Sequence, residues 1–162
     1  MIVLAIDPGL ASVGYSLVKG EKDKFEVLEY GCIRTSARKK TPLRIYEIYE
    51  ALKALAEKYH PETVILEKVF FAKNVKTALL VGESRGAIQL LAATLGIEVH
   101  EFTPLQVKQA MTGFGRASKN QIKEMVQRIF SLPKPPTPDD AADALAIAFT
   151  FFQTNRLEQY LA

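Results

Sequence analysis

The sequence predicts an α/β protein in which one mixed five-stranded sheet carries helices on both faces. The chain has 162 residues, of which 48% are hydrophobic and 24% charged, as in an ordinary globular domain. Its first fifth is rich in β-type segments, and helical patterns then alternate with short apolar segments. Strands that pair first as a meander and later alternate with helices form a mixed sheet. We therefore expect a single domain over residues 1–162.

The five expected strands are short and rich in apolar or β-branched residues. The first is a continuous apolar run that ends at the turn signal Asp7-Pro8-Gly9. A polar stretch separates the second from the third, which favours hairpin connections. The strands are expected at Ile2–Ile6, Gly14–Val18, Phe25–Arg34, Thr63–Leu66 and Ile97–Phe102.

The first two expected helices have clear start and stop residues. Thr41-Pro42 supplies an N-cap and an N1 proline for a helix that Pro61 ends. Asn74 is expected to cap a long helix that reaches Leu95 and is closed by Gly96. That second helix is apolar on more than one side, so it needs two partners, and a second subunit is a candidate for the outer side.

Capping patterns also mark the C-terminal helices. Thr103–Gln106 and Ser118–Gln121 are capping-box sequences that each open a helix. The glycine-bearing loop Gly113–Arg116 lies between these two helices. Thr137-Pro138 is expected to start a last helix that reaches about Gln153.

Charge and cysteine content narrow the classes of function. The net charge is +3, and residues 68–128 carry nine basic groups against four acidic ones, which suits a polyanionic partner but also an ordinary solvated surface. The single cysteine, Cys32, excludes an internal disulfide and is expected to be a small buried hydrophobe. No leader and no apolar run near 18 residues is found, so we expect a cytosolic protein without a membrane segment.

Four carboxylates stand at unusual positions. Asp7 and Glu67 end apolar strands, and parallel neighbouring strands would bring both to the same edge of the sheet. Asp140 and Asp143 share one face of the last helix at a spacing of i, i+3. Asp143 is the only charged residue in segment 141–152, where an unpaired charge would cost on the order of several kcal/mol. A divalent cation between Asp143 and the strand-end acids would compensate that charge.

Each acid also has a purely structural interpretation. Asp7 could form a turn, Glu67 could reach solvent, and Asp143 could pair with a lysine from elsewhere in the fold. Asp139 lies at the start of the last helix, where acids interact favourably with the helix dipole. It also shares a face with Asp143 at i, i+4, so helical geometry does not choose between Asp139 and Asp140.

The donor set predicts the type of metal and the type of chemistry. Oxygen ligands alone favour a hard ion, Mg²⁺, with Mn²⁺ as a substitute. Two such ions about 3.5–4 Å apart can hold the attacking and leaving oxygens of an in-line phosphoryl displacement. In this reaction a metal-bound water attacks and a 3′-oxygen leaves, so the protein needs clustered acids and no nucleophile of its own.

Four segments occur in a specific order along the chain: Ala5–Gly9, Leu66–Phe70, Gln106–Gln109 and Asp140–Ala148. Together they resemble the RuvC family of bacterial Holliday-junction resolvases, and the resemblance extends from Met1 to about Phe152. It implies a ribonuclease H-like fold, a homodimer and Mg²⁺ dependence. It further implies paired symmetric nicks at four-way DNA junctions that leave 5′-phosphate and 3′-hydroxyl ends, in recombination and repair, and a partnership with the RuvA–RuvB branch-migration complex.

The resemblance also assigns site residues. Asp7, Glu67, Asp140 and Asp143 match the catalytic, metal-binding acids of the family. Phe70 matches an aromatic residue placed against junction bases, although Phe71 or Val75 could simply pack inward where the next helix begins. Lys108 and Lys119 match basic residues near the DNA, but each could be an ordinary solvated lysine. Arg116, in its glycine-flanked loop, is a further candidate for DNA contact.

Three other functions fit parts of the sequence. Asp7-Pro8-Gly9 with Gly14 resembles the first phosphate loop of actin-like kinases and ATPases, but the second phosphate loop and the adenosine segment of that class are absent from the 162 residues. A non-catalytic junction-binding module would not need all four acids. Another ribonuclease H-like nuclease, acting on RNA or linear DNA, is the third alternative.

Overall fold

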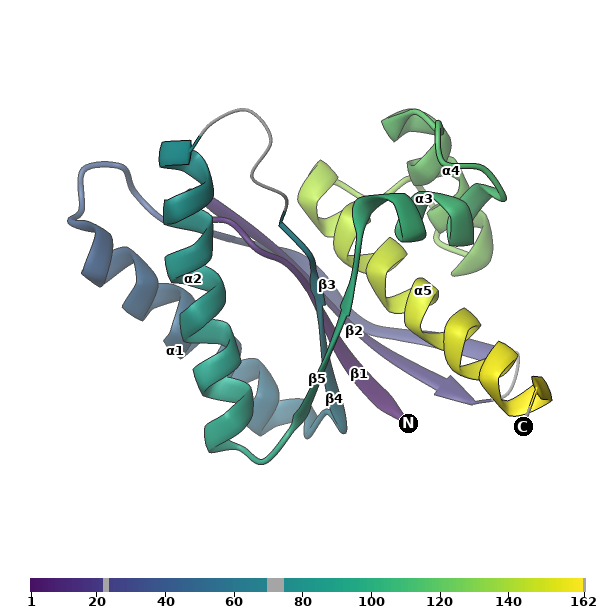
Figure 1. Cartoon of the computed structure of the whole chain (residues 1–162), viewed down its shortest axis with the longest axis horizontal. Coiled ribbons are helices and arrows are strands. Elements are labelled where there is room, and N and C mark those ends of the chain that lie inside the picture. Colours follow the sequence, from purple (N-terminus) through teal and green to yellow (C-terminus); the bar gives the residue numbers. More distant parts are fainter. Residues whose placement is uncertain (22–23, 70–74, 162) are drawn as a thin grey trace.

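A mixed five-stranded sheet forms the centre of the computed structural model, which describes residues 1–21, 24–69 and 75–161 (Figure 1). The sheet has the strand order β3-β2-β1-β4-β5. β1 pairs antiparallel with β2, and β2 antiparallel with β3, whereas β4 is parallel to both β1 and β5. The strands are β1 (Ile2–Asp7), β2 (Ser12–Glu21), β3 (Lys24–Arg34), β4 (Thr63–Glu67) and β5 (Glu98–Phe102).

The predicted strands are therefore confirmed, with one clear difference in length. β2 extends beyond the expected Gly14–Val18 because its polar ends are paired with β3. Ser12 lies opposite Arg34 and Glu21 opposite Lys24, so ladder hydrogen bonds hold residues that the apolar pattern does not mark as strand.

Over the residues that the structure describes, five helices connect and cover the strands. Both predicted capping boxes are present, since Thr103 and Ser118 each accept a hydrogen bond from the backbone N–H three residues later. The predicted N-cap at Thr41 is wrong by one residue: Lys40 is the extended N-cap, and its carbonyl accepts from the N–H of Arg44. The predicted cap Asn74 lies outside the described residues. The helices are α1 (Thr41–Tyr59), α2 (Val75–Thr94), α3 (Pro104–Thr112), α4 (Lys119–Ile129) and α5 (Asp139–Leu161).

The last helix is longer than expected, and its composition explains why. Nothing after Pro138 breaks a helix, because the remaining sequence contains neither glycine nor proline. The hydroxyl groups of Thr150 and Thr154 donate to backbone carbonyls of the preceding turn. α5 therefore continues beyond the apolar stretch that suggested an end near Gln153.

The helices cover both faces of the sheet, as predicted (Figure 1). In β1, Leu4 and Ile6 pack toward α1 and α2, whereas Val3 and Ala5 pack toward α3, α4 and α5. This alternation is the period-2 pattern of a strand buried on both sides. Within the part of the chain that the structure describes, no helix combines the length and apolarity needed to cross a membrane.

Candidate metal centre

The two strand-end acids lie side by side at one edge of the sheet. β1 and β4 are parallel and in register, with Ile6 opposite Leu66, so both strands end at the same edge. Asp7 follows the orientation of Val3 and Ala5, and Glu67 that of Ile65, because side chains alternate along a strand. Both carboxylates therefore face α5, as the parallel arrangement predicts.

Helix α5 brings the other two acids to this edge. Its first turns are lined by alanines, and Ala141, Ala142 and Ala144 are fully buried. Gly14 of β2 lies opposite Asp7 in the sheet, and a Cβ atom there would be 1.9 Å from the backbone oxygen of Asp140. The helix can approach β2 this closely only because residue 14 has no side chain.

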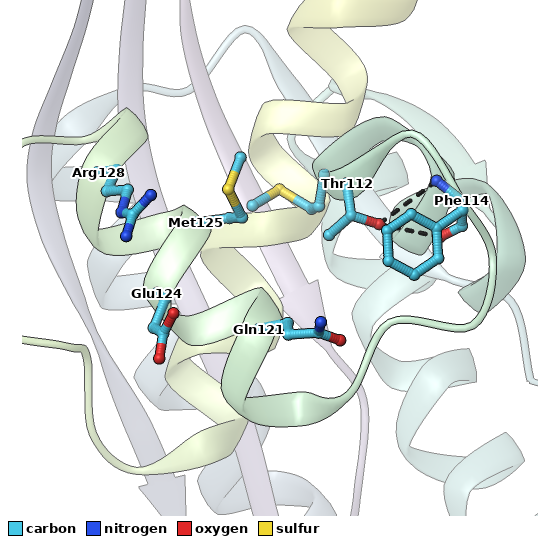
Figure 2. Close-up of a pocket in the computed structure, with 7 residues that line it drawn as sticks. Thr112, Phe114, Gln121, Glu124, Met125 and Arg128 are labelled. Atoms are coloured by element: carbon cyan, nitrogen blue, oxygen red, sulfur yellow. Dashed lines mark hydrogen bonds between the residues drawn. The ribbon is translucent and has the colours of Figure 1, made fainter.

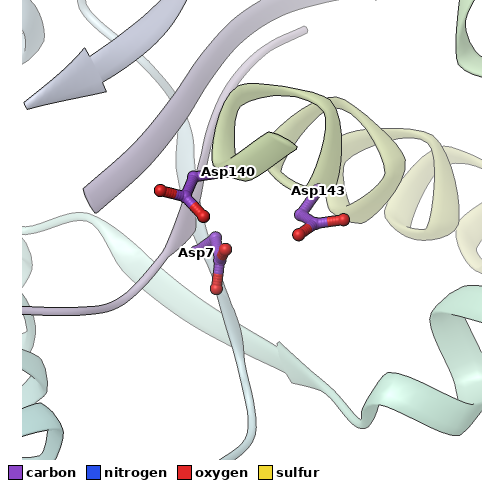
Figure 3. Close-up of side chains that lie close together, drawn as sticks. All are labelled: Asp7, Asp140 and Asp143. Carbon is purple, nitrogen blue, oxygen red and sulfur yellow. The ribbon is translucent and has the colours of Figure 1, made fainter. Parts of the chain in front are cut away.

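Three carboxylates converge at this point. Asp7, Asp140 and Asp143 each offer an oxygen, and these oxygens all lie within 4.8 Å of one another (Figure 3). Glu67 is not part of that close group, but it lines the same cavity of about 370 Å³. The sequence-predicted acids thus meet at one site, with three in metal-binding proximity and the fourth on its wall.

Asp7, Glu67 and Asp143 resist ionisation. Burial first, and then the negative charges of Glu67, Asp143 and Asp140, together raise the pKa of Asp7 to about 8. Burial together with the charge of Asp143 raises the pKa of Glu67 to about 7. The pKa of Asp143 is also raised, mainly by burial. Buried carboxylates that repel one another need protons or a cation, so the donor set fits a divalent metal ion.

Two lysines reach the cavity but compensate these charges only in part. Nζ of Lys119 is 4.0 Å from Oδ2 of Asp143, at the outer limit of an ion pair, and its side chain is 72% exposed. Lys108 lines the cavity, and both lysines lower the pKa of Glu67 against the stronger effect of burial. The alternative in which Asp143 pairs with a lysine from elsewhere is therefore realised only as a weak, solvent-screened contact.

The remaining predicted residues lie elsewhere. Asp139 accepts a hydrogen bond from Nζ of Lys123 at 2.9 Å, which lowers its pKa, so Asp140 rather than Asp139 joins the close group of acids. Arg116 is exposed and is not among the residues that line the cavity. Phe70 lies outside the described residues.

Sequence reasoning missed two residues beside Asp140. The hydroxyl of Ser12 donates to Oδ2 of Asp140, and Sγ of Cys32 lies within hydrogen-bonding distance of the Ser12 hydroxyl. Cys32 is half-buried among polar groups, so its interpretation as a simple buried hydrophobe is wrong. The signal for both is the hairpin register: Cys32 pairs with Gly14, which in turn lies opposite Asp7.

A second hollow lies between α3 and α4 and has a different character (Figure 2). It has a volume of about 270 Å³, and methionines and an aromatic ring form much of its wall. The hydroxyl of Thr112 holds the loop at its rim by donating to the carbonyl of Phe114 at 2.9 Å. Glu124 is the one acid among the residues that line this hollow, so the hollow has no cluster of acids. Its lining residues are Met111, Thr112, Phe114, Gln121, Glu124, Met125 and Arg128.

Comparisons with known proteins lead to one family. The family model described as "Crossover junction endodeoxyribonuclease RuvC" matches residues 3–151. A crossover junction endodeoxyribonuclease RuvC from Syntrophomonas wolfei is 48% identical over 161 residues, covering 99% of this chain and 94% of the relative. That of Moorella thermoacetica is 51% identical over 148 residues, covering 91% and 89% of the two chains.

Solved structures agree with the sequence matches. The structure of Thermus thermophilus RuvC has a TM-score of 0.89 and 34% identity, and the match covers 98% of this chain and 97% of that one. The structure of the same protein in complex with a Holliday junction substrate has a TM-score of 0.93 and 33% identity, covering 98% and 96%.

Proposed function

The chain belongs to the RuvC family of crossover junction endodeoxyribonucleases, and on this premise we propose that it resolves four-way DNA junctions. It would do so by paired symmetric nicks that leave 5′-phosphate and 3′-hydroxyl ends, in recombination and repair. The observation that carries the proposal is the convergence of Asp7, Asp140 and Asp143 in one cavity with Glu67. Hydrolysis of phosphodiesters by metal-dependent nucleases uses such a cluster.

We assign the four acids to binding Mg²⁺, two ions during catalysis, with Mn²⁺ as a substitute. When bound, the metal supplies Lewis-acid activation and neutralises charge on the scissile phosphate. The raised pKa values of Asp7 and Glu67 support this role, because a cation would replace the protons that these side chains otherwise retain. Asp7 and Asp140, which lie next to each other, would orient the ions relative to the phosphate together with Asp143, one turn along α5 (Figure 3).

The DNA backbone would be held by basic side chains beside the acids. Lys108 and Lys119 line the cavity, where their ammonium groups can bind phosphates that flank the cut. Arg116, exposed in the loop that follows α3, and Phe70, which follows β4, are proposed as further DNA contacts on the basis of their sequence positions. Phosphate contacts supply most of the affinity for DNA, so binding should weaken steeply with salt.

A homodimer is part of the proposal, since a four-way junction needs two equivalent cuts. The support comes from α2, whose outer side exposes Val75, Leu79 and Leu90 by 58% or more. Large apolar side chains gathered on one surface mark interaction sites. Association with RuvA and RuvB, and a cytoplasmic location with access to DNA, complete the proposal and are supported by family membership.

The direct test uses a synthetic four-way junction and a linear duplex of matched sequence. Purified protein with Mg²⁺ should nick the junction symmetrically in two strands of like polarity, leave the duplex intact, and lose activity in EDTA. Equal cleavage of the duplex would instead support a general ribonuclease H-like nuclease. Tight junction binding without any nick, in Mg²⁺ or Mn²⁺, would support a non-catalytic junction-binding module.

A further inference from the structure

The hydroxyl of Ser12 meets the carboxylate of Asp140 across 128 residues of sequence. We propose that Ser12 is a positioning residue that fixes the orientation of the Asp140 carboxylate for metal binding. This inference rests on the proposed metal-dependent function and adds a residue that the four-acid assignment does not contain.

Ser12 belongs to a row of small side chains along one face of β2. Alternation places Ser12, Gly14 and Ser16 on the face that meets α5, and we call these three residues the β2 contact row. Gly14 lies against the backbone of Asp140, and the hydroxyl of Ser16 donates to the carbonyl of Ala144 at 2.9 Å. The row therefore contacts the first turns of α5 at successive points. Only Ser12 contacts a carboxylate.

Asp140 needs such a contact because of its place in the helix. It lies in the first turn of α5, where backbone N–H groups lack helical partners and attract acidic side chains. A carboxylate turned toward those groups would leave the metal site. The hydrogen bond from Ser12 to Oδ2 holds the side chain against β2 and leaves Oδ1 available to an ion. Figure 3 shows one oxygen of Asp140 directed toward Asp7 and the other directed away.

Cys32 in turn holds the hydroxyl of Ser12 in place. That hydroxyl has one proton, which goes to Asp140, so the thiol of Cys32 is the donor to the Ser12 oxygen. Sγ of Cys32 also lies 3.8 Å from Oδ2 of Asp140. Because a thiol is a weak donor, Cys32 supports the orientation of Ser12 and contributes less than Ser12 does.

The experiment compares Ser12→Ala with Ser16→Ala, the matched loss of a hydroxyl from the same row. Mn²⁺ affinity is measured on the DNA-free protein by electron paramagnetic resonance, and the Mg²⁺ concentration for half-maximal junction nicking is measured alongside it. Loss of a hydrogen bond to a metal ligand typically weakens metal affinity about 10–100-fold, and we expect about 10-fold for Ser12→Ala in both measurements. Ser12→Thr, which keeps the hydroxyl, should restore both to within about 3-fold.

Ser16→Ala separates a positioning effect from a structural one. Ser16 contacts only the backbone of α5 among the polar contacts described for it, so this variant should lower the melting temperature and leave Mn²⁺ affinity unchanged. Wild-type Mn²⁺ affinity in Ser12→Ala would overturn the inference, and so would equal weakening in the two variants, which would indicate general loosening of α5. If wild type and Asp7→Asn gave the same Mn²⁺ signal, the proposed metal site and this inference would both fall.

Discussion

Two carboxylate sites lie on opposite faces of the same sheet. At one site, donors within the protein stabilise the ionised carboxylate, and at the other, burial and neighbouring acids destabilise it. On the α1 face, Glu29 accepts hydrogen bonds from Tyr59 at 2.7 Å, from Lys58 at 3.0 Å and from Tyr15 at 3.0 Å. These donors, Tyr59 foremost, lower the pKa of Glu29. On the α5 face, burial and neighbouring acids raise the pKa of Asp7 to about 8.

The difference shows how a structural carboxylate can be told from a functional one. Glu29 has its compensating groups within the protein, so folding alone satisfies it. The acid cluster has Lys119 at 4.0 Å from Asp143 as its described ion pair, and a largely exposed lysine contributes little. Burial of several like charges costs stability unless a cation joins them. The acid cluster is therefore the site that an external ligand completes.

The largest expected effect is on junction cleavage, which should depend on the acid cluster and not on Glu29. Asp7→Asn should reduce junction cleavage by about 10³-fold or more, because metal activation supplies several kcal/mol of transition-state stabilisation. Junction binding should stay within about 3-fold of wild type, since phosphate contacts dominate it. Glu29→Gln serves as the control and should cleave normally. Loss of binding together with cleavage in Asp7→Asn would mean that Asp7 is structural.

The second effect concerns stability and pH. Between pH 4 and pH 8 the folded protein holds a proton on Asp7 that the unfolded chain releases, so without metal the free energy of unfolding should fall as pH rises. At pH 8, Asp7→Asn should therefore be more stable than wild type by about 2–4 kcal/mol. Urea titrations in EDTA measure this difference, and saturating Mg²⁺ should shrink it. If wild type were as stable as Asp7→Asn at pH 8, the claim that the negative charge of Asp7 destabilises the folded protein would be wrong.

A third effect tests the lysine at the cavity. Lys119→Ala should weaken junction binding about 3- to 10-fold at physiological salt and make its salt dependence shallower by about one unit of slope. Lys58→Ala, which removes the lysine beside Glu29, is the matched control. Fluorescence anisotropy at several salt concentrations measures both. An unchanged slope in Lys119→Ala would place that lysine away from the DNA.

The fourth effect is confined to the structural site. Tyr59→Phe removes one hydrogen bond to Glu29 and should lower the free energy of unfolding by about 1 kcal/mol. The Mg²⁺ requirement for nicking should stay within about 2-fold of wild type. Thermal melts and nicking assays check the two statements. A changed Mg²⁺ requirement would show that the two sites are coupled across the sheet.

The smallest effect belongs to the acid next to the cluster. Asp139→Asn breaks a surface contact with Lys123 and should change cleavage by less than about 2-fold, because exposed ion pairs contribute little. Asp140→Asn, measured beside it, should lose most of the activity. Equal losses in the two variants would assign Asp139 a role in the site.

Much of the fold could be predicted because its signals are local. The apolar runs that end at Asp7 and Glu67 mark two strands, and the capping boxes at Thr103 and Ser118 mark two helix starts within four residues each. The capping pattern places the start of α1 one residue too late, because Lys40, which makes no side-chain capping hydrogen bond, serves as N-cap. Local patterns therefore locate elements well and their ends less well.

The sequence predicts those parts of the site that follow from residue types, and it does not predict those that depend on contacts between distant segments. Four acids at strand and helix ends indicate a cation site, but helical geometry does not choose between Asp139 and Asp140. The resemblance alone selects Asp140, and the pairing of Asp139 with Lys123 supplies the physical reason. The contact between Ser12 and Asp140 depends on the register of β2 and on the close approach that Gly14 permits. The donors around Glu29 come from β2 and α1, so no short segment reveals that Glu29 is satisfied.

The most direct test of a cation-completed acid cluster is anomalous diffraction from crystals grown with Mn²⁺. We expect a manganese peak among Asp7, Asp140 and Asp143, bound by their carboxylate oxygens, and no peak at Glu29. Crystals saturated with Mn²⁺ that show the acids without a peak, or manganese bound only elsewhere, would contradict this expectation.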